Sequence, residues 1–279
     1  MILSADFTFS QSNLQDYRDC HYRFYLRYVL HTRWPALVVE DALKFEQRGQ
    51  SGARFHRLVQ QWLLGVPENR LHALVTGDPD PDLGQWWENF LEAIPPLLDG
   101  ERFVETTLAT NLAGHRALAK YDLILVQPDG RLIIYDWKTS QKKPRQDWLE
   151  DRVQTRLYQF ILACSGGVLT NRAMVTPEQI EMRYWFAPNR TAPITLTYNT
   201  DRFEQDRDYF TDLINEITDK PADSFFRTAD EALCRFCVYR AHCDRGTLGG
   251  DLEDLEDSDR QPEGFEDLLD FDQISEIEF

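Results

Sequence analysis

The stretch Ile133-Ile134-Tyr135-Asp136-Trp137-Lys138 decides how this sequence is interpreted. An apolar run of this kind, which follows the turn signal Pro128-Asp129-Gly130, predicts a buried strand over residues 131–137. Asp136 and Lys138 are two residues apart, so a strand directs both side chains to the same face. A carboxylate and a lysine together at a strand end are typical of metal-dependent cleavage of phosphodiester bonds.

A second carboxylate is expected beside the first. Strands are predicted over residues 103–108 and 118–126, and Asp122 lies in the later of these two. Because neighbouring strands of a hairpin lie side by side, we expect Asp122 and Asp136 to reach the same edge of the sheet. Mg²⁺ and Mn²⁺ prefer oxygen ligands of this kind. The ammonium group of Lys138 would then orient the attacking water or neutralise charge on the phosphorus.

Three further residues are candidates for the same site. Gln154 and Tyr158 are four residues apart on one face of a predicted helix, and they could reach the phosphate backbone or the surroundings of the metal. His56, four residues after Gly52, could add a nitrogen ligand. Taken singly, each of these residues is more often part of an ordinary amphipathic helix, and Asp-x-Lys alone is a weak signal. The hypothesis therefore depends on their convergence.

The remaining pattern predicts an α/β fold with a mixed central sheet flanked by helices. Its front part is helical and its end is a cysteine-bearing loop. Residues 67–83 are rich in Pro, Asp and Gly, and they are expected to form a loop. The other expected elements are helices over residues 14–28, 52–64, 86–98, 148–163 and 201–217, and strands over 181–186 and 194–198.

Four cysteines form a candidate metal site. Cys234, Cys237 and Cys243 are clustered near the C-terminus, and Cys20 lies far upstream. Four thiolates suit either a [4Fe–4S] cluster or a tetrahedral Zn²⁺, and His21 or His242 could replace one thiol in a zinc site. The remaining cysteine, Cys164, follows an apolar helical run and is expected in the core.

Charge and composition narrow the class of protein. The net charge is −17, but residues 246–279 hold 13 acids and one arginine, so they carry −12 of it, and residues 1–245 carry −5. We therefore expect one domain over 1–245 and an acidic, disordered tail over 246–279. No signal-peptide pattern or apolar run long enough for a membrane span is found, which predicts a cytoplasmic protein. Without a Gly-Lys-Ser/Thr phosphate loop, the chain is not expected to be a motor.

The ordered series Gly52-x3-His56, Asp122, Asp136-Trp137-Lys138 and Gln154-x3-Tyr158 resembles the motifs of RecB-like nucleases of the PD-(D/E)XK superfamily. The opening segment 9–20 and the cysteine set also resemble AddB-type subunits and CRISPR-associated iron–sulfur exonucleases. Departures from the family pattern include Ala119 where a glycine is common and His21 where a proline is common.

This resemblance implies a restriction-endonuclease-like fold and a site in which each residue has a role. His56, Asp122, Asp136 and the Trp137 carbonyl would hold Mg²⁺ or Mn²⁺, Lys138 would be the catalytic lysine, and Gln154 and Tyr158 would support them. It also favours an iron–sulfur cluster, with Cys20 as the fourth ligand beside Cys234, Cys237 and Cys243.

The function expected from residues and resemblance together is a metal-dependent DNA nuclease. It would be an exonuclease on single strands or ends, in repair, recombination or CRISPR adaptation. The alternatives are a silent nuclease-fold subunit that binds DNA beside a helicase, and a zinc-stabilised binding module.

Overall fold

The computed structural model describes residues 3–4, 6–32, 42–170, 174–189, 191–235 and 237–246, with side chains of the helix at 42–63 described from residue 49. Except for Gly246, the acidic tail expected over 246–279 lies outside the described residues. Among the described helices, none combines the length and apolar character needed to cross a bilayer.

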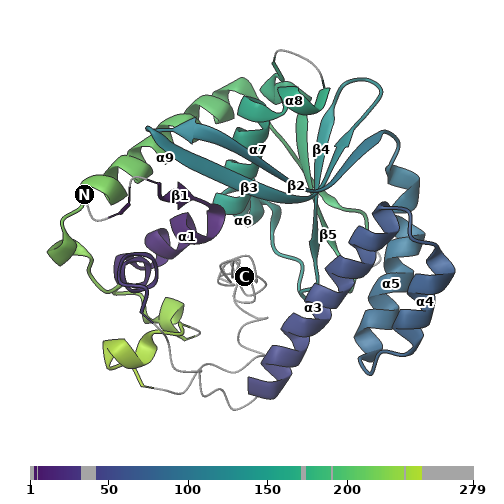
Figure 1. Ribbon diagram of the computed structural model, residues 1–279, viewed down its shortest axis with the longest axis horizontal. Helices are drawn as coiled ribbons and strands as arrows, with labels where there is room; N and C mark the ends of the chain where they lie inside the picture. Colours follow the sequence, from purple (N-terminus) through teal and green to yellow (C-terminus); the bar gives the residue numbers. More distant parts are fainter. Residues whose placement is uncertain are drawn as a thin grey trace, which may run out of the picture.

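The protein is a mixed α/β structure around one six-stranded sheet (Figure 1). Strand β3 lies between β2 on one side and both β1 and β4 on the other, and β5 and β6 continue the sheet beyond β4. The β4–β5 and β1–β3 pairs are parallel and the others are antiparallel. The strands are β1 Thr8–Phe9, β2 Glu101–Leu112, β3 His115–Val126, β4 Leu132–Lys138, β5 Ile180–Phe186 and β6 Ile194–Thr197.

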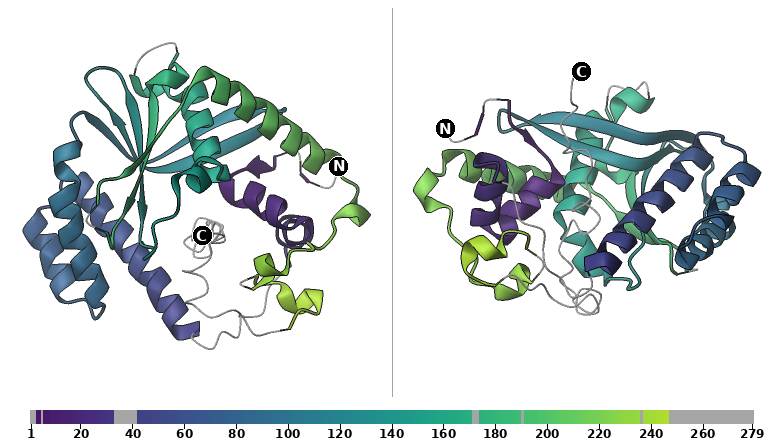
Figure 2. Two further views of the ribbon diagram at one scale, coloured as in Figure 1. Left: turned by 180° about the vertical axis from the view of Figure 1, so that it is seen from behind. Right: turned by 60° about the horizontal axis from the view of Figure 1, so that its bottom comes forward.

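Helices cover both faces of this sheet. The two further views in Figure 2 show α3, α4 and α5 grouped at one end of the molecule, α9 toward the other end, and α7 between them against the sheet. The helices are α1 Gln11–Asp19, α2 His21–Phe24, α3 Ala42–Leu63, α4 Glu68–Thr76, α5 Pro81–Ala93, α6 Gln146–Glu150, α7 Val153–Ser165, α8 Gly167–Thr170 and α9 Thr200–Asp219. The arrangement confirms the expected mixed sheet flanked by helices.

Each face of the sheet has its own apolar core. Ile133, Tyr135 and Trp137 of β4 pack with α3, α4 and α5, whereas Leu132 and Ile134 pack with α1, α7 and α9. This division follows from the alternation of side chains along a strand. A strand with apolar residues at every position is therefore buried on both faces, as its continuous apolar run predicts.

Three expected elements differ in the structure. Residues 67–83 are not a loop, because α4 lies there and buries Leu71 and Val75 at helical spacing. The helix expected over 14–28 is interrupted at Cys20, whose backbone is extended (φ −161°, ψ 109°). The helix expected over 148–163 is divided into α6 and α7. Cys164 is exposed, so its assignment to the core was wrong.

Candidate active site and cysteine pocket

The two aspartates lie where β3 and β4 begin to separate. The last pairs between these strands run from Val126↔Leu132 to Leu123↔Tyr135, so the next position places Asp122 opposite Asp136. The backbone pairing does not continue there. Instead, Asp122 Oδ2 accepts a hydrogen bond from the Trp137 backbone N–H at 2.9 Å. The sheet register therefore brings the two carboxylates to neighbouring positions, as the sequence predicted.

Lys138 and Gln154 hold the carboxylate of Asp136. The Lys138 ammonium lies 2.9 Å from Asp136 Oδ2, and the Gln154 amide donates to Asp136 Oδ1 at 2.6 Å. Lys138 Nζ also donates to Gln154 Oε1 at 3.3 Å, which closes a ring of three side chains. Asp136 is 5% exposed and Gln154 is also buried. Charge-assisted bonds in such a place are stronger than their exposed counterparts, so these side chains have defined positions.

The residues beside Gln154 fix the position of α7. Thr155 Oγ1 donates to the Leu149 carbonyl at 2.5 Å and lies 2.8 Å from the Tyr184 hydroxyl. The next residue, Arg156, pairs through Nε at 2.6 Å with Asp206, which is fully buried in α9. Buried polar groups that are fully paired specify one arrangement of their helices. The first turn of α7 is thereby anchored, and Gln154 is held over the end of β4.

His56 reaches the same site from the other layer. Its Nδ1 atom lies 3.5 Å from Asp122 Oδ1. This approach depends on Gly52, one turn earlier in α3, because a Cβ atom at that position would lie 3.0 Å from Thr139 Oγ1. A glycine allows a helix to approach the end of β4 closely. The spacing Gly52-x3-His56 thus has a structural reason.

These groups give Asp122 an unusual electrostatic environment. Burial raises the pKa of Asp122, but the positive charge of His56 and the hydrogen bonds from His56 and the Trp137 N–H outweigh it. Lys138 acts in the same direction, so the pKa of Asp122 lies below its usual range. Asp122 therefore stays ionised at neutral pH, which is the form that binds a cation.

Tyr158 lies one turn after Gln154 in α7, and it contacts Tyr121 of β3. Its ring packs against that of Tyr121 at 4.9 Å between centroids, and its carbonyl accepts a hydrogen bond from the Tyr121 hydroxyl at 2.9 Å. Tyr121 precedes Asp122 in β3. These contacts tie α7 to the strand that carries the first aspartate.

We refer to His56, Asp122, Asp136, Lys138 and Gln154 as the strand-end site. Carboxylate oxygens with one imidazole form a donor set that suits Mg²⁺ or Mn²⁺. Within the described part of the chain, no three His, Cys, Asp or Glu side chains surround a single point at which a metal ion would be held. Asp136 faces Lys138 and Asp122 faces His56. The carboxylates and the imidazole are thus suitable ligands for Mg²⁺ or Mn²⁺ and lie next to one another. Each carboxylate is paired with a side chain of the protein.

Sequence reasoning missed one residue beside this site. Glu105 of β2 lies opposite Asp122 across the β2–β3 ladder, because the flanking pairs are Val104↔Leu123 and Thr106↔Tyr121. The sequence contains one indication that Glu105 lies opposite Asp122, namely the turn between the two strands. The two residues Ala113 and Gly114 form the hairpin turn, both with positive φ, and a two-residue turn fixes the register of both strands.

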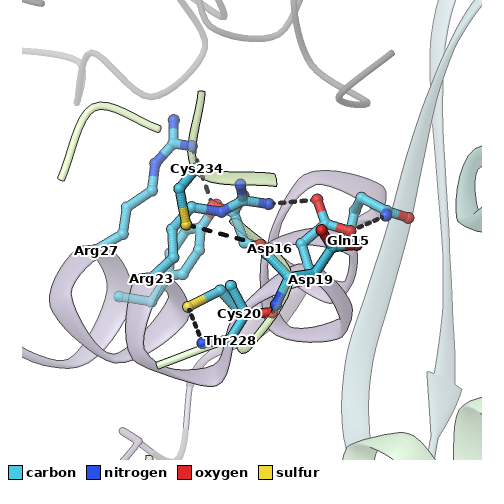
Figure 3. A network of polar contacts seen from close by, with 10 residues as sticks. Gln15, Asp16, Asp19, Cys20, Arg23, Arg27, Thr228 and Cys234 are labelled. Atoms are coloured by element: carbon cyan, nitrogen blue, oxygen red, sulfur yellow. Dashed lines mark hydrogen bonds and ion pairs between the residues drawn. The ribbon is translucent and has the colours of Figure 1, made fainter. Parts of the chain in front are cut away.

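The four predicted cysteines line a common pocket, which we call the cysteine pocket. Cys20 contributes from the break between α1 and α2, and Cys234, Cys237 and Cys243 contribute from the segment after α9. Figure 3 shows Cys20 and Cys234 with Arg23 and Thr228 around them. The Thr228 N–H donates to Cys20 Sγ at 3.4 Å, and Arg245 donates to Cys234 Sγ at 2.6 Å. Segments more than 200 residues apart in sequence meet here.

The surroundings of the pocket are charged but paired. Arg23 is 9% exposed and makes ion pairs with Asp16 at 2.8 Å and Asp19 at 2.6 Å. Burial raises the pKa of Cys237 to about 11, although Arg23 lowers it. A buried thiol with such a pKa is neutral at pH 7, and a metal would be needed to hold it as a thiolate.

The cysteine pocket fits a sulfur-ligated group by donor type. Its lining includes the four cysteines and neither of the two histidines proposed as substitutes, His21 and His242. His21 instead stacks on Tyr17. In the described residues the thiols are not arranged around one point in the manner of metal ligands. Four sulfur donors in one pocket suit a [4Fe–4S] cluster or Zn²⁺ equally.

Comparisons with known proteins give two similar solved structures. One is a protein designated SSO0001, at 13% identity and a TM-score of 0.39, with 85% of each chain covered. The other is a "putative exonuclease" from Eubacterium rectale, at 12% identity and a TM-score of 0.47, with 90% of this chain and 93% of the other covered. No curated protein matches the sequence.

The family comparison is more extensive. The profile that describes the PD-(D/E)XK nuclease superfamily matches residues 8–244, which is most of the chain and includes every residue of the strand-end site and the four cysteines of the cysteine pocket. The mixed sheet flanked by helices agrees with this match. The chain therefore belongs to the PD-(D/E)XK nuclease superfamily.

Proposed function

We propose that the protein is a Mg²⁺- or Mn²⁺-dependent deoxyribonuclease that acts as an exonuclease on single strands or DNA ends. The observation that carries this proposal is the contact between Asp136, Lys138 and Gln154 beside Asp122. Two aspartates on neighbouring strands beside a half-buried lysine are costly for a purely structural sheet, because the like charges of the aspartates repel. They are useful where a cation and a phosphate must be bound together.

Each residue of the strand-end site has its own role in the proposed reaction. His56, Asp122, Asp136 and the Trp137 carbonyl would hold the cation, which polarises a phosphate oxygen and lowers the pKa of a bound water. Lys138 supplies a fixed positive charge for the phosphate or the attacking water, in a place where little solvent screens it. Gln154 orients both Asp136 and Lys138. Tyr158 supports this arrangement through its contacts with Tyr121.

A cleavage assay tests this proposal. End-labelled single-stranded and double-stranded DNA would be incubated with the protein and Mg²⁺ or Mn²⁺, and product lengths would be followed with time. Wild type is compared with Asp136→Asn and with Asp129→Asn, a matched change at an exposed aspartate of the preceding turn. We expect wild type and Asp129→Asn to shorten DNA from an end and Asp136→Asn to be inactive. Equal cleavage by all three would assign the activity to another site or to a contaminant.

We propose further that the cysteine pocket holds a [4Fe–4S] cluster, with Zn²⁺ as the alternative. The support is the shared pocket of Cys20, Cys234, Cys237 and Cys243, together with buried Arg23 beside it. Four thiolates around an iron–sulfur cube carry a net negative charge, which the guanidinium groups of Arg23 and Arg245 would offset. The group would join the N-terminal helices to the segment after α9.

Metal analysis distinguishes the two groups. Protein purified without oxygen would be analysed for iron, acid-labile sulfide and zinc, and its visible absorbance would be recorded. Four iron atoms and four sulfides per chain, with broad visible absorbance that dithionite bleaches, are the expected result. One zinc per chain without visible absorbance would establish the alternative. Absence of both metals from the folded protein would refute the role given to the cysteines.

A further inference from the structure

Glu105 is an unexpected acidic residue in the middle of a long strand. It lies in β2, whose other central residues are Val104 and Thr106. Its side chain is 24% exposed, and its carboxylate lies 3.4 Å from the Lys120 ammonium. Asp122 and His56 both interact electrostatically with the Glu105 carboxylate, which therefore lies near the strand-end site.

The register places three carboxylates in one row. Glu105 is opposite Asp122 across the β2–β3 ladder, and Asp122 is opposite Asp136 by extension of the β3–β4 ladder. Neighbouring strands are about 4.8 Å apart. The row thus crosses three adjacent strands with Asp122 at its centre. Like charges at opposite positions of a sheet destabilise it, so such a row needs a compensating reason.

The backbone changes conformation at this row. Glu105 has φ +50°, and the Glu105–Asp122 position is missing from an otherwise continuous run of β2–β3 pairs. In β3, Tyr121 packs into the core beside α7, whereas Leu123 packs into the core beside α3. The side chains of β3 therefore change from one face of the sheet to the other at Asp122. Residues of α3 and of α7 can both approach the strand at this position. A left-handed conformation at a residue other than glycine is uncommon and strained, and such residues cluster at functional sites.

The charges around Glu105 come from two elements. Lys120 and Asp122 of β3 and His56 of α3 all interact electrostatically with it. Burial raises the pKa of Glu105, and the charge of Asp122 raises it further, while Lys120 and His56 lower it. Glu105 is thus a carboxylate that shares its surroundings with two of the proposed cation ligands, Asp122 and His56.

We propose that Glu105 is a further functional residue of the strand-end site and that its carboxylate takes part in binding the divalent cation beside Asp122. This inference rests on the proposed function, because it assigns an additional ligand to the same cation. It accounts for an acidic side chain at a left-handed position where a glycine or an asparagine would fit the backbone with less strain. It also explains why the row extends to β2.

Cation affinity, measured without DNA, tests the inference. Mn²⁺ would be titrated into the full chain and followed by calorimetry and by the paramagnetic resonance of free Mn²⁺. Wild type is compared with Glu105→Gln, Glu105→Asp and Glu101→Gln. Glu101 is the matched control because it is an exposed glutamate four residues earlier in the same strand. Circular dichroism of each variant establishes that it is folded.

We expect Glu105→Gln to bind Mn²⁺ about 10-fold to 100-fold more weakly, Glu105→Asp to recover part of the affinity, and Glu101→Gln to equal wild type. Equal affinity of wild type and Glu105→Gln would overturn the inference and leave the proposed nuclease intact. A loss that Glu101→Gln shares would also overturn it, because a general effect of strand charge would then suffice. No Mn²⁺ binding by wild type would overturn both this inference and the proposed function.

Discussion

The strand-end site and the cysteine pocket both join residues that are far apart in sequence, but different forces hold them. At the strand-end site, the sheet register sets the positions of Asp122 and Asp136, and the partners of each carboxylate are protein groups such as Lys138. In the cysteine pocket, the cysteines come from the break between α1 and α2 and from short turns such as Glu231–Cys234 and Arg240–Cys243.

This difference predicts which of the two sites forms without its proposed metal ion or cluster. A hydrogen-bonded sheet buried on both faces persists without a cation, so the strand-end site is formed by the fold itself. Short turns bury little apolar surface, so the binding free energy of the metal group proposed for the cysteine pocket would contribute to the free energy of folding. We therefore expect that removing the cation from the strand-end site abolishes DNA cleavage and leaves the fold intact. Removing the metal group from the cysteine pocket is expected to lower the stability of the fold.

The largest expected effect separates catalysis from cation binding at the strand-end site. Lys138→Met removes the ammonium beside Asp136 and should lower the rate of DNA cleavage about 10²-fold to 10³-fold, as expected for a lost electrostatic stabiliser. Mn²⁺ affinity should stay equal or rise, because Asp136 loses a competing cation. Single-turnover cleavage and Mn²⁺ titration measure the two. Lys143→Met, in the loop that follows β4, is the control. A parallel loss of affinity and rate would contradict the role given to Lys138.

The next effect concerns the cysteine pocket. Cys237→Ala removes a buried thiol and should destabilise the fold, with a fall in Tm of several degrees, since each kcal/mol corresponds to about 2–4 °C in a chain of this size. Cys164→Ala is the matched control because that cysteine is exposed and lies outside the pocket. Differential scanning calorimetry under anaerobic conditions measures both. If Cys237→Ala melts with wild type, the pocket does not stabilise the fold.

The pH dependence of the free energy of unfolding tests whether the strand-end site is formed without a cation. Because the folded pKa of Asp122 is below the unfolded value of about 3.9, its ionised form stabilises the fold above about pH 4, and this contribution disappears as the pH falls through the folded pKa. Asp122→Asn should therefore lower stability at neutral pH and make the acid limb shallower. Urea unfolding between neutral and acidic pH measures this. An unchanged acid limb would show that His56 and Trp137 do not hold Asp122 as described.

The smallest expected effect has the opposite sign. Glu105→Gly relieves the left-handed backbone at that position and removes a carboxylate whose raised pKa makes its ionised form unfavourable. A group of this kind costs stability above its folded pKa, so the variant should be more stable at neutral pH, by about 1 kcal/mol from the backbone alone. Urea unfolding checks this. A destabilised Glu105→Gly protein would mean that the side chain is structural.

The sequence predicted the strands and the adjacency of Asp122 and Asp136 better than the helices. The apolar run at 133–137 and the turn at 128–130 determine β4, and the adjacent strand then brings Asp122 beside Asp136. The helix α4 was missed because Pro67 and the run of Pro, Asp and Gly at 77–82 were extended to the whole segment, although residues 68–76 contain none of these residue types. Only Leu71 and Val75 show its apolar face, and burial against neighbouring helices stabilises it.

Two details depended on tertiary structure. The position of Glu105 beside Asp122 requires the strand register, which follows from the Ala113-Gly114 turn, and its positive φ cannot be inferred from side-chain alternation. The exposure of Cys164 could not be predicted either, because the end of α7 looks apolar in sequence while only part of its surface contacts the core. Local pattern specifies which residues form an element and tertiary packing decides which of them are covered.

The most direct test of the account is to locate the bound cation. Crystals of the protein soaked in Mn²⁺ would be measured near the manganese absorption edge, and the anomalous difference map would be inspected at the end of β4. The account predicts a peak within ligand distance of both Asp122 and Asp136. A map in which Mn²⁺ occupies other positions, while these two aspartates remain bound only to His56 and Lys138, would contradict it.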